Sequence, residues 1–110
     1  MALREKQLAQ AAITASNATV YTVPVNVVTM MKDFDLANTT VGDLTVNIHI
    51  VPDEGVAGTD NAIAYEYVVL ANDVYSWRGL QVMEAGGKII VKASAVGLTI
   101  TASGVERRLQ

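Results

Sequence analysis

Several residue types are rare or absent in this sequence of 110 residues: it has no cysteine, one histidine and two prolines. The lack of cysteine excludes disulfides, thiolate nucleophiles and cysteine-based zinc sites, so stability must come from packing. Charged residues make up only 17% of the chain, its net charge is -3, and lysine and arginine form no cluster. Because neutralisation of phosphates dominates nucleic-acid affinity, we expect no direct binding of DNA or RNA.

Long hydrophobic runs are also missing. The longest uninterrupted apolar run covers residues 67–71, whereas a membrane-spanning helix needs about 20 apolar residues, so we expect no membrane span. Residues 1–7 carry mixed charge and lack the apolar centre of a secretory signal. We therefore expect the protein to stay in the cytosol until it is assembled.

Apolar residues are what the chain has in abundance, at 51% of the total. A chain of this length is expected to form one domain with one core. The apolar share lies above that of an average soluble domain, and the charged share lies below it. We expect part of the apolar surface to lie against a partner.

From Ile13 onward, apolar and polar residues alternate with the period of two that is typical of β-strands. About eight strands follow at roughly ten-residue spacing, and no connection is long enough for a crossover helix. The chain is therefore predicted to be all-β, a single antiparallel β-sandwich that is jelly-roll-like, although spacing does not separate jelly-roll from immunoglobulin-like wiring. The predicted strands cover residues 18–23, 27–38, 44–50, 63–69, 74–78, 80–83, 88–95 and 98–103.

The same alternation predicts which side chains face the core. In the second predicted strand it places Val28, Met30, Phe34 and Leu36 on one face. Gly79 is expected to mark a bulge between two strands. In the strands and turns that follow residue 44, the residues expected inside are Val46, Ile48, Ile50, Tyr65, Val69 and Ile100.

The amino-terminal segment is expected to be separate from the sandwich. Its good helix formers, with apolar positions at Leu3 and Leu8, favour either two turns of helix or an extended arm. We expect residues 1–12 to be an assembly arm that attaches to neighbouring subunits through these leucines, followed by a β-sandwich domain over residues 13–110. Residues 106–110 are expected to form a short polar tail.

The longest loop signal covers residues 52–61, which are rich in glycine and acidic or amide residues. Loops carry binding functions more often than strands do, so Asp53, Glu54 and Val56 are candidate partner-binding residues. Asp53, Glu54 and Asp60 offer oxygen ligands, but their spacing lacks the alternating donors of a calcium loop. We expect a solvated loop that is more mobile than the flanking strands.

No set of residues forms a recognisable catalytic, cofactor or metal site. His49 lies on the polar, solvent-facing side of its predicted strand, and a metal site or a histidine acid–base site would require partners. Asp33 and Asp35 share a strand face with no apolar cleft around them, and motifs for phosphate, dinucleotide or serine-hydrolase chemistry are absent. We expect no enzyme activity and no cofactor. Tyr65 and Trp77 are expected to fill the core, although on an exposed face they would make a sugar- or protein-binding platform.

Six short motifs follow one another between Val20 and Glu106. They are Val20-Tyr21-Thr22-Val23-Pro24, Ala37-Asn38-Thr39, Val46-Asn47-Ile48-His49-Ile50-Val51-Pro52, Tyr75-Ser76-Trp77-Arg78-Gly79-Leu80, Val82-Met83-Glu84-Ala85-Gly86-Gly87-Lys88-Ile89 and Leu98-Thr99-Ile100-Thr101-Ala102-Ser103-Gly104-Val105-Glu106. In this order, over about four fifths of the chain, they resemble a group of small virion structural proteins of tailed bacteriophages. Members of that group often have aspartate where this chain has Gly87, so the turn at this position is expected to differ.

The resemblance implies a β-sandwich that serves as a building block of the virion and carries no catalytic residues. It implies a capsid decoration or cement protein whose partners are the major capsid protein or other virion proteins, with homo-oligomeric contacts. The alternative is a fibre- or tail-associated adaptor, or a module that recognises a receptor or carbohydrate. Either role places the protein in the virion, after assembly in the cytoplasm of the host bacterium.

Overall fold

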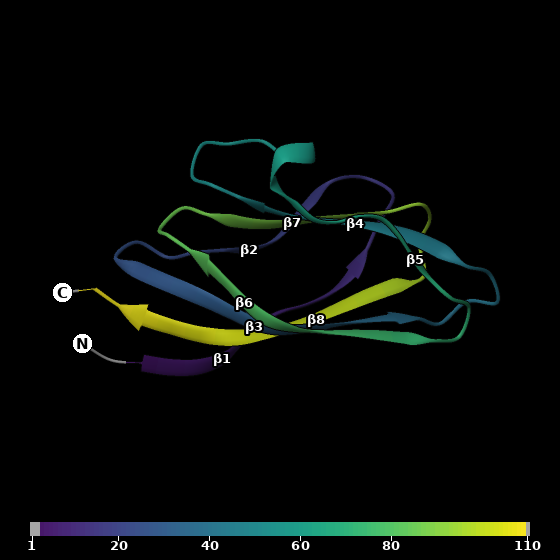
Figure 1. The fold of residues 1–110 in the computed structure, drawn as a ribbon, viewed down its shortest axis with the longest axis horizontal. Coiled ribbons are helices and arrows are strands. Elements are labelled where there is room, and N and C mark those ends of the chain that lie inside the picture. The colour runs from purple at the N-terminus through teal and green to yellow at the C-terminus, as the bar shows by residue number, and fades with distance from the viewer. Residues whose placement is uncertain (1–2, 110) are drawn as a thin grey trace.

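The computed structural model describes residues 3–109 as two four-stranded sheets packed face to face (Figure 1). All strand pairs are antiparallel, so the predicted all-β sandwich is confirmed. A short 3-10 helix, η1 (Thr59–Asn61), interrupts the long loop. The strands are β1 (Leu3–Ile13), β2 (Ala18–Thr22), β3 (Val27–Asn38), β4 (Leu44–Val51), β5 (Ala62–Val69), β6 (Val74–Met83), β7 (Lys88–Ala93) and β8 (Leu98–Arg108).

The strand pairing is that of a jelly roll. Strand β1 pairs with β8, β2 with β7, β3 with β6 and β4 with β5. Such nested pairs arise when one long antiparallel ribbon is rolled up into two layers, with sheet orders β1-β8-β3-β6 and β2-β7-β4-β5. The wiring that strand spacing left open is therefore jelly-roll wiring.

One hydrophobic core fills the space between the two sheets. Side chains alternate between the faces of a strand, so each sheet contributes its inward-facing residues to this core. Among the residues predicted to lie inside, Val46, Ile48, Val69 and Ile100 are buried and Ile50 is half-buried.

A β-bulge in β3 reverses part of the expected alternation. The register of β3 against both β6 and β8 shifts at Lys32. Thr29 is buried ahead of this bulge and Phe34 is buried beyond it, whereas Val28 and Met30 are half-exposed on the outer face. The prediction that Val28 and Met30 share a face with Phe34 is wrong, because one extra residue exchanges the two faces of a strand.

The amino-terminal segment is part of the sandwich. Strand β1 pairs with β8 from Leu3 to Ile13, and its Leu8 lies in the core. Over the residues that the structure describes, this corrects the boundary expected after residue 12; residues 1–2 lie outside them. Strand β8 supplies the hydrogen-bond partners for the backbone of this segment. The pattern of side chains in the sequence does not indicate this pairing.

The carboxy-terminal end is also a strand and not the expected polar tail. Strand β8 lies between β1 and β3 and continues as far as Arg108. Both neighbours offer backbone partners to this end of β8, and Glu106 is buried there. The tail prediction is wrong because this end pairs with a strand on each side and turns one of its polar side chains, Glu106, into the interior.

Strands β5 and β6 confirm one expectation and correct another. The register of β6 against β3 shifts between Arg78 and Gln81, which confirms the bulge expected at Gly79, although the strand continues through it. Tyr65 was predicted to be buried and is 53% exposed. The register of β5 shifts beside it, and Glu66 has a φ of 49°, so the local backbone turns away from the regular alternation.

Candidate functional site

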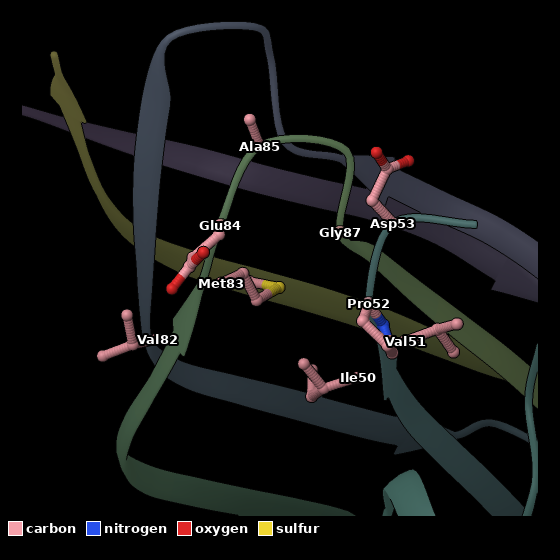
Figure 2. A pocket seen from close by; sticks show the side chains of 9 residues that line it. All are labelled: Ile50, Val51, Pro52, Asp53, Val82, Met83, Glu84, Ala85 and Gly87. Carbon is pink, nitrogen blue, oxygen red and sulfur yellow. The ribbon is translucent and has the colours of Figure 1, made fainter. Parts of the chain in front are cut away.

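A hollow of about 480 Å³ lies at one end of the sandwich. It lies between the end of β4 and the turn that joins β6 to β7 (Figure 2). Figure 2 shows Ile50 and Met83 at its base, with Asp53 and Glu84 on opposite walls. The full lining is Ile50, Val51, Pro52, Asp53, Val82, Met83, Glu84, Ala85 and Gly87.

The walls of this hollow are two turns that contact each other. Gly86 has a φ of +84°, and a Cβ at this position would collide with the Asp53 side chain. The loop after β4 therefore packs directly on the backbone of the β6–β7 turn, which only glycine permits in this conformation. An apolar base with carboxylates at the rim is suited to holding an apolar side chain of a partner.

No group of three or more metal-ligating side chains occurs among residues 3–109. In the same part of the chain, no helix has the length and apolar character needed to span a bilayer.

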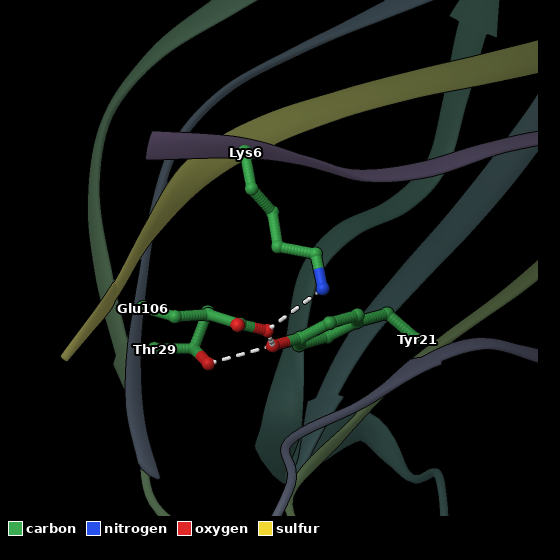
Figure 3. Close-up of polar contacts among 4 residues, drawn as sticks. All are labelled: Lys6, Tyr21, Thr29 and Glu106. Carbon is green, nitrogen blue, oxygen red and sulfur yellow. Dashed lines mark hydrogen bonds and ion pairs between the residues drawn. The ribbon is translucent and has the colours of Figure 1, made fainter. Parts of the chain in front are cut away.

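A buried polar cluster lies between the two layers, at the side of the sandwich formed by the edge strands β1 and β2 (Figure 3). The Tyr21 hydroxyl donates a hydrogen bond of 2.6 Å to Glu106 Oε2, and Lys6 Nζ lies 3.3 Å from the same oxygen. The Tyr21 and Thr29 hydroxyl oxygens are 2.7 Å apart. Since the Tyr21 proton is used on Glu106, Thr29 donates in this second bond.

The cluster fixes the protonation of its members. Burial raises the pKa of Tyr21, and the hydrogen bond to the Glu106 carboxylate raises it further, so Tyr21 stays protonated and acts as a donor. Burial alone would raise the pKa of Glu106, but hydrogen bonds from Tyr21 and Lys6, and the charges of Lys6 and Arg4, outweigh it and lower this pKa. The cluster thus links β1, β2, β3 and β8 through two hydrogen bonds and one ion pair, as expected of a structural site.

His49 is buried, which corrects the prediction that it faces solvent. Its Nδ1 lies 2.9 Å from Asn61 Oδ1, and because an amide oxygen cannot donate, Nδ1 carries the proton. Asn61 also accepts from the Gly58 amide at 3.1 Å and donates to the Val56 carbonyl at 2.9 Å. The hydrogen bond from His49 holds the long loop against the outer face of β4. Nothing in the sequence indicates that a loop covers this face.

The residues predicted to bind partners do not form one site. Leu8 is only 7% exposed and belongs to the core, so it is not available to a partner. Leu3 is 68% exposed in one layer, whereas Asp53, Glu54 and Val56 are exposed on the loop above the other layer (Figure 1). Of these only Asp53 lines the hollow.

A concentration of exposed apolar residues on β5, on β6 and directly after β5 was not predicted from sequence. Strands β5 and β6 are the edge strands of the two sheets on the same side of the sandwich. Tyr67 and Tyr75 meet there with ring centroids 4.5 Å apart, and Trp77 stacks on buried Phe34 at 5.2 Å. The exposed residues are Tyr65, Tyr67, Val68, Leu70, Val74, Leu80 and Val82. Which strands lie at the sheet edges follows only from the topology, so the sequence alone did not indicate that these residues are exposed.

Comparisons with known proteins identify the fold. No protein-family model and no curated protein matches the chain. Among solved structures, a chain from the Bacillus endospore appendages, described as a novel family of disulfide-linked pili, matches with a TM-score of 0.56 and 14% identity over 98% of this chain and 89% of that chain.

Two structures of infectious bursal disease virus are also similar to this chain. The Gx strain structure matches with a TM-score of 0.55 and 12% identity over 94% of this chain and 32% of that chain. The VP2 subviral particle matches with a TM-score of 0.52 and 12% identity over 96% of this chain and 32% of that chain. The chain thus spans about a third of these viral chains. At such identities the likeness shows a shared fold, and the assignment to tailed bacteriophages stays a prediction.

Proposed function

We propose that this chain is a structural building block of a virion, most specifically a capsid decoration or cement protein of a tailed bacteriophage. The observation that carries the proposal is the jelly roll over residues 3–109 with exposed apolar residues gathered along one side of it. Structures with this fold that match the chain come from a viral particle and a pilus. Apolar surface of this kind is stabilised when it is buried in an assembly.

The residues give no support to a catalytic role, and we propose that the protein is not an enzyme. The buried carboxylate of Glu106 is engaged within the fold, by a hydrogen bond from Tyr21 and an ion pair with Lys6. The end hollow contains carboxylates but neither a histidine nor a lysine among its lining residues. A decoration protein needs complementary surfaces and a stable fold, and both of these are compatible with the residues present.

A second role, as a fibre-associated adaptor or receptor-binding module, is favoured by the end hollow alone. Its apolar base would take an apolar side chain or a sugar ring, with Asp53 and Glu84 at the rim as hydrogen-bond acceptors. Apart from Val82, which also lines the hollow, the exposed apolar residues on β5 and β6 and just after β5 lie outside it, and this role does not account for them.

Immunogold labelling of intact phage particles from the source culture distinguishes these roles. Decoration predicts gold at many positions over the head, whereas the adaptor role predicts gold confined to the tail or its fibres. Unlabelled particles, in a preparation where a known capsid protein is labelled, would contradict both roles. An antibody raised against the full chain is suitable because the outer faces of the strands carry exposed residues that it can bind.

A further inference from the structure

The sandwich has four edge strands, and three of them carry features that oppose pairing with another strand. Strand β1 starts with Arg4, Glu5 and Lys6 and contains a register shift. Strand β2 has only five residues, and β5 has two register shifts and the positive φ of Glu66. Charges, short length and bulges are the devices by which proteins keep sheet edges from associating.

Strand β6 is the least protected of these edges. It has ten residues, and residues 74–78 pair with β3 in regular register. This segment contains no proline and no bulge, and its single charged residue, Arg78, lies 3.7 Å from Asp33 of the same chain. Alternate residues of an edge strand direct unpaired amide and carbonyl groups outward, so this segment presents a regular template for another strand.

The segment is also self-complementary. Asp73 precedes it and Arg78 ends it, with Val74, Tyr75, Ser76 and Trp77 between them. Antiparallel pairing of two copies about Ser76 keeps the two Arg78 side chains at opposite ends of the contact. Parallel pairing would place them side by side, and like charges across strands are unfavourable.

We propose that two copies of this chain associate by antiparallel pairing of residues 74–78, centred on Ser76, which joins two four-stranded sheets into one of eight strands. In this register Ser76 faces Ser76 of the second copy, Tyr75 faces Trp77, and Val74 faces Arg78. The contact is isologous, as two-fold symmetry requires. The biological role of this contact rests on the proposed function, because the contact would be the homo-oligomeric one of a virion building block.

Exposed apolar residues lie in the pairing segment and directly after it on the same strand. Val74 is 56% exposed, and Leu80 and Val82 are 53% and 57% exposed, so a second copy laid along this edge would remove apolar surface from water. The half-buried rings of Tyr75 and Trp77 lie at the centre of the segment, where aromatic residues contribute most to binding.

The register can be tested at Ser76, which is exposed and makes no core contact. Sedimentation velocity of the full chain at about 100 µM should show a dimer for the wild type. Ser76→Lys would place two ammonium groups opposite each other at the two-fold axis, so it should give a folded monomer with an unchanged circular dichroism spectrum. Thr99→Lys is the matched control, because Thr99 is equally exposed on the outer face of the same sheet but lies on β8.

Ser76→Cys tests the geometry directly, because the chain contains no other cysteine. Side chains directly opposite across an antiparallel pair are about 5 Å apart, so a mild oxidant or a short bismaleimide should convert the variant to covalent dimer. Thr99→Cys should remain largely uncoupled. The pairing is overturned if the wild type is a monomer, if Ser76→Lys remains a dimer, or if both cysteine variants couple equally. These results concern the purified chain alone, so a monomer would leave the particle labelling and the proposed function standing.

Discussion

At the scale of residues, the most informative group is the buried carboxylate of Glu106. A buried charge is tolerated only when it is paired and hydrogen-bonded, and Tyr21 and Lys6 meet both needs. Because these partners come from β2 and β1, the carboxylate ties the two layers together at the edge where β1 lies. Its ionisation state therefore affects the stability of the whole sandwich.

Glu106→Gln is expected to lower stability in a manner that depends on pH. The folded pKa of Glu106 lies below its ordinary value of 4.5, so the carboxylate stabilises the fold fully above pH 4.5 and loses this effect as the pH falls through the folded pKa. At pH 7 the variant should be less stable by about 1–3 kcal/mol. Melting temperatures of both proteins from pH 7 to pH 3 should converge at the acid end.

The control for this titration is Glu5→Gln, which removes a carboxylate from an exposed position on the neighbouring strand β1. Its melting curve should follow that of the wild type at every pH. A gap between wild type and Glu106→Gln that stays constant down to pH 3 would show that the charge of Glu106 does not contribute as described.

Gly104→Ala is expected to be strongly destabilising. Gly104 pairs with Met31 beside the β3 bulge, and a Cβ there would collide with the Met30 carbonyl oxygen, which belongs to the backbone and cannot move away. We expect a loss of at least about 2 kcal/mol in the free energy of unfolding, measured with urea. Gly42→Ala has open space around the new methyl group and should stay within about 0.5 kcal/mol of the wild type. Equal effects at both glycines would contradict the close approach of β8 to β3.

At the scale of elements, β1 tests whether the amino-terminal segment is a strand or a detachable arm. Leu8→Ala should cost about 2–4 kcal/mol, because Leu8 is buried between the sheets. Leu3→Ala removes the same atoms from an exposed position of the same strand and should cost less than about 0.5 kcal/mol. Equal and small losses of stability in urea titrations would show that the segment is not docked in solution.

The loop between β4 and β5 is expected to exchange its amide hydrogens faster than the strands on either side, because most of its residues are exposed. Asn61→Ala should accelerate this exchange further, since Asn61 makes the hydrogen bonds to His49, Gly58 and Val56. Hydrogen exchange followed by mass spectrometry measures both effects. Exchange in the loop as slow as in β4 would refute the expected mobility.

The sequence predicted the interior elements well and the sheet edges poorly. The bounds of β3 and the position of the long loop follow from alternation and turn residues, which act locally. By contrast, β1 and the end of β8 obtain backbone partners from strands about 100 residues apart in the chain, so local pattern carries no signal for them.

The burial of Tyr65 and His49 was predicted wrongly for a related reason. Tyr65 was assigned to the core because it alternates with polar neighbours, but bulges in β5 turn it outward. His49 was assigned to solvent because its strand has a polar face, but the loop folds back over that face. In both cases the deciding contact is with a segment whose position only the fold defines.

At the scale of the whole molecule, the chain is a jelly roll without disulfides that carries exposed apolar residues on β5 and β6 and just after β5. The pilus structure with the same fold belongs to a family described as disulfide-linked, whereas this chain has no cysteine for such a link. Contacts between copies of this chain therefore cannot be disulfides, and we propose that they use the β6 edge. Self-association would then bury the residues that make the isolated chain unusually apolar.

The most direct test of the central claim is an electron cryomicroscopy reconstruction of the intact particle. The account predicts eight-stranded sandwiches of this chain at repeated positions on the outer surface of the head, in contact with the capsid shell and with one another. A well-resolved head that lacks such density would contradict it, as would density for this chain confined to the tail.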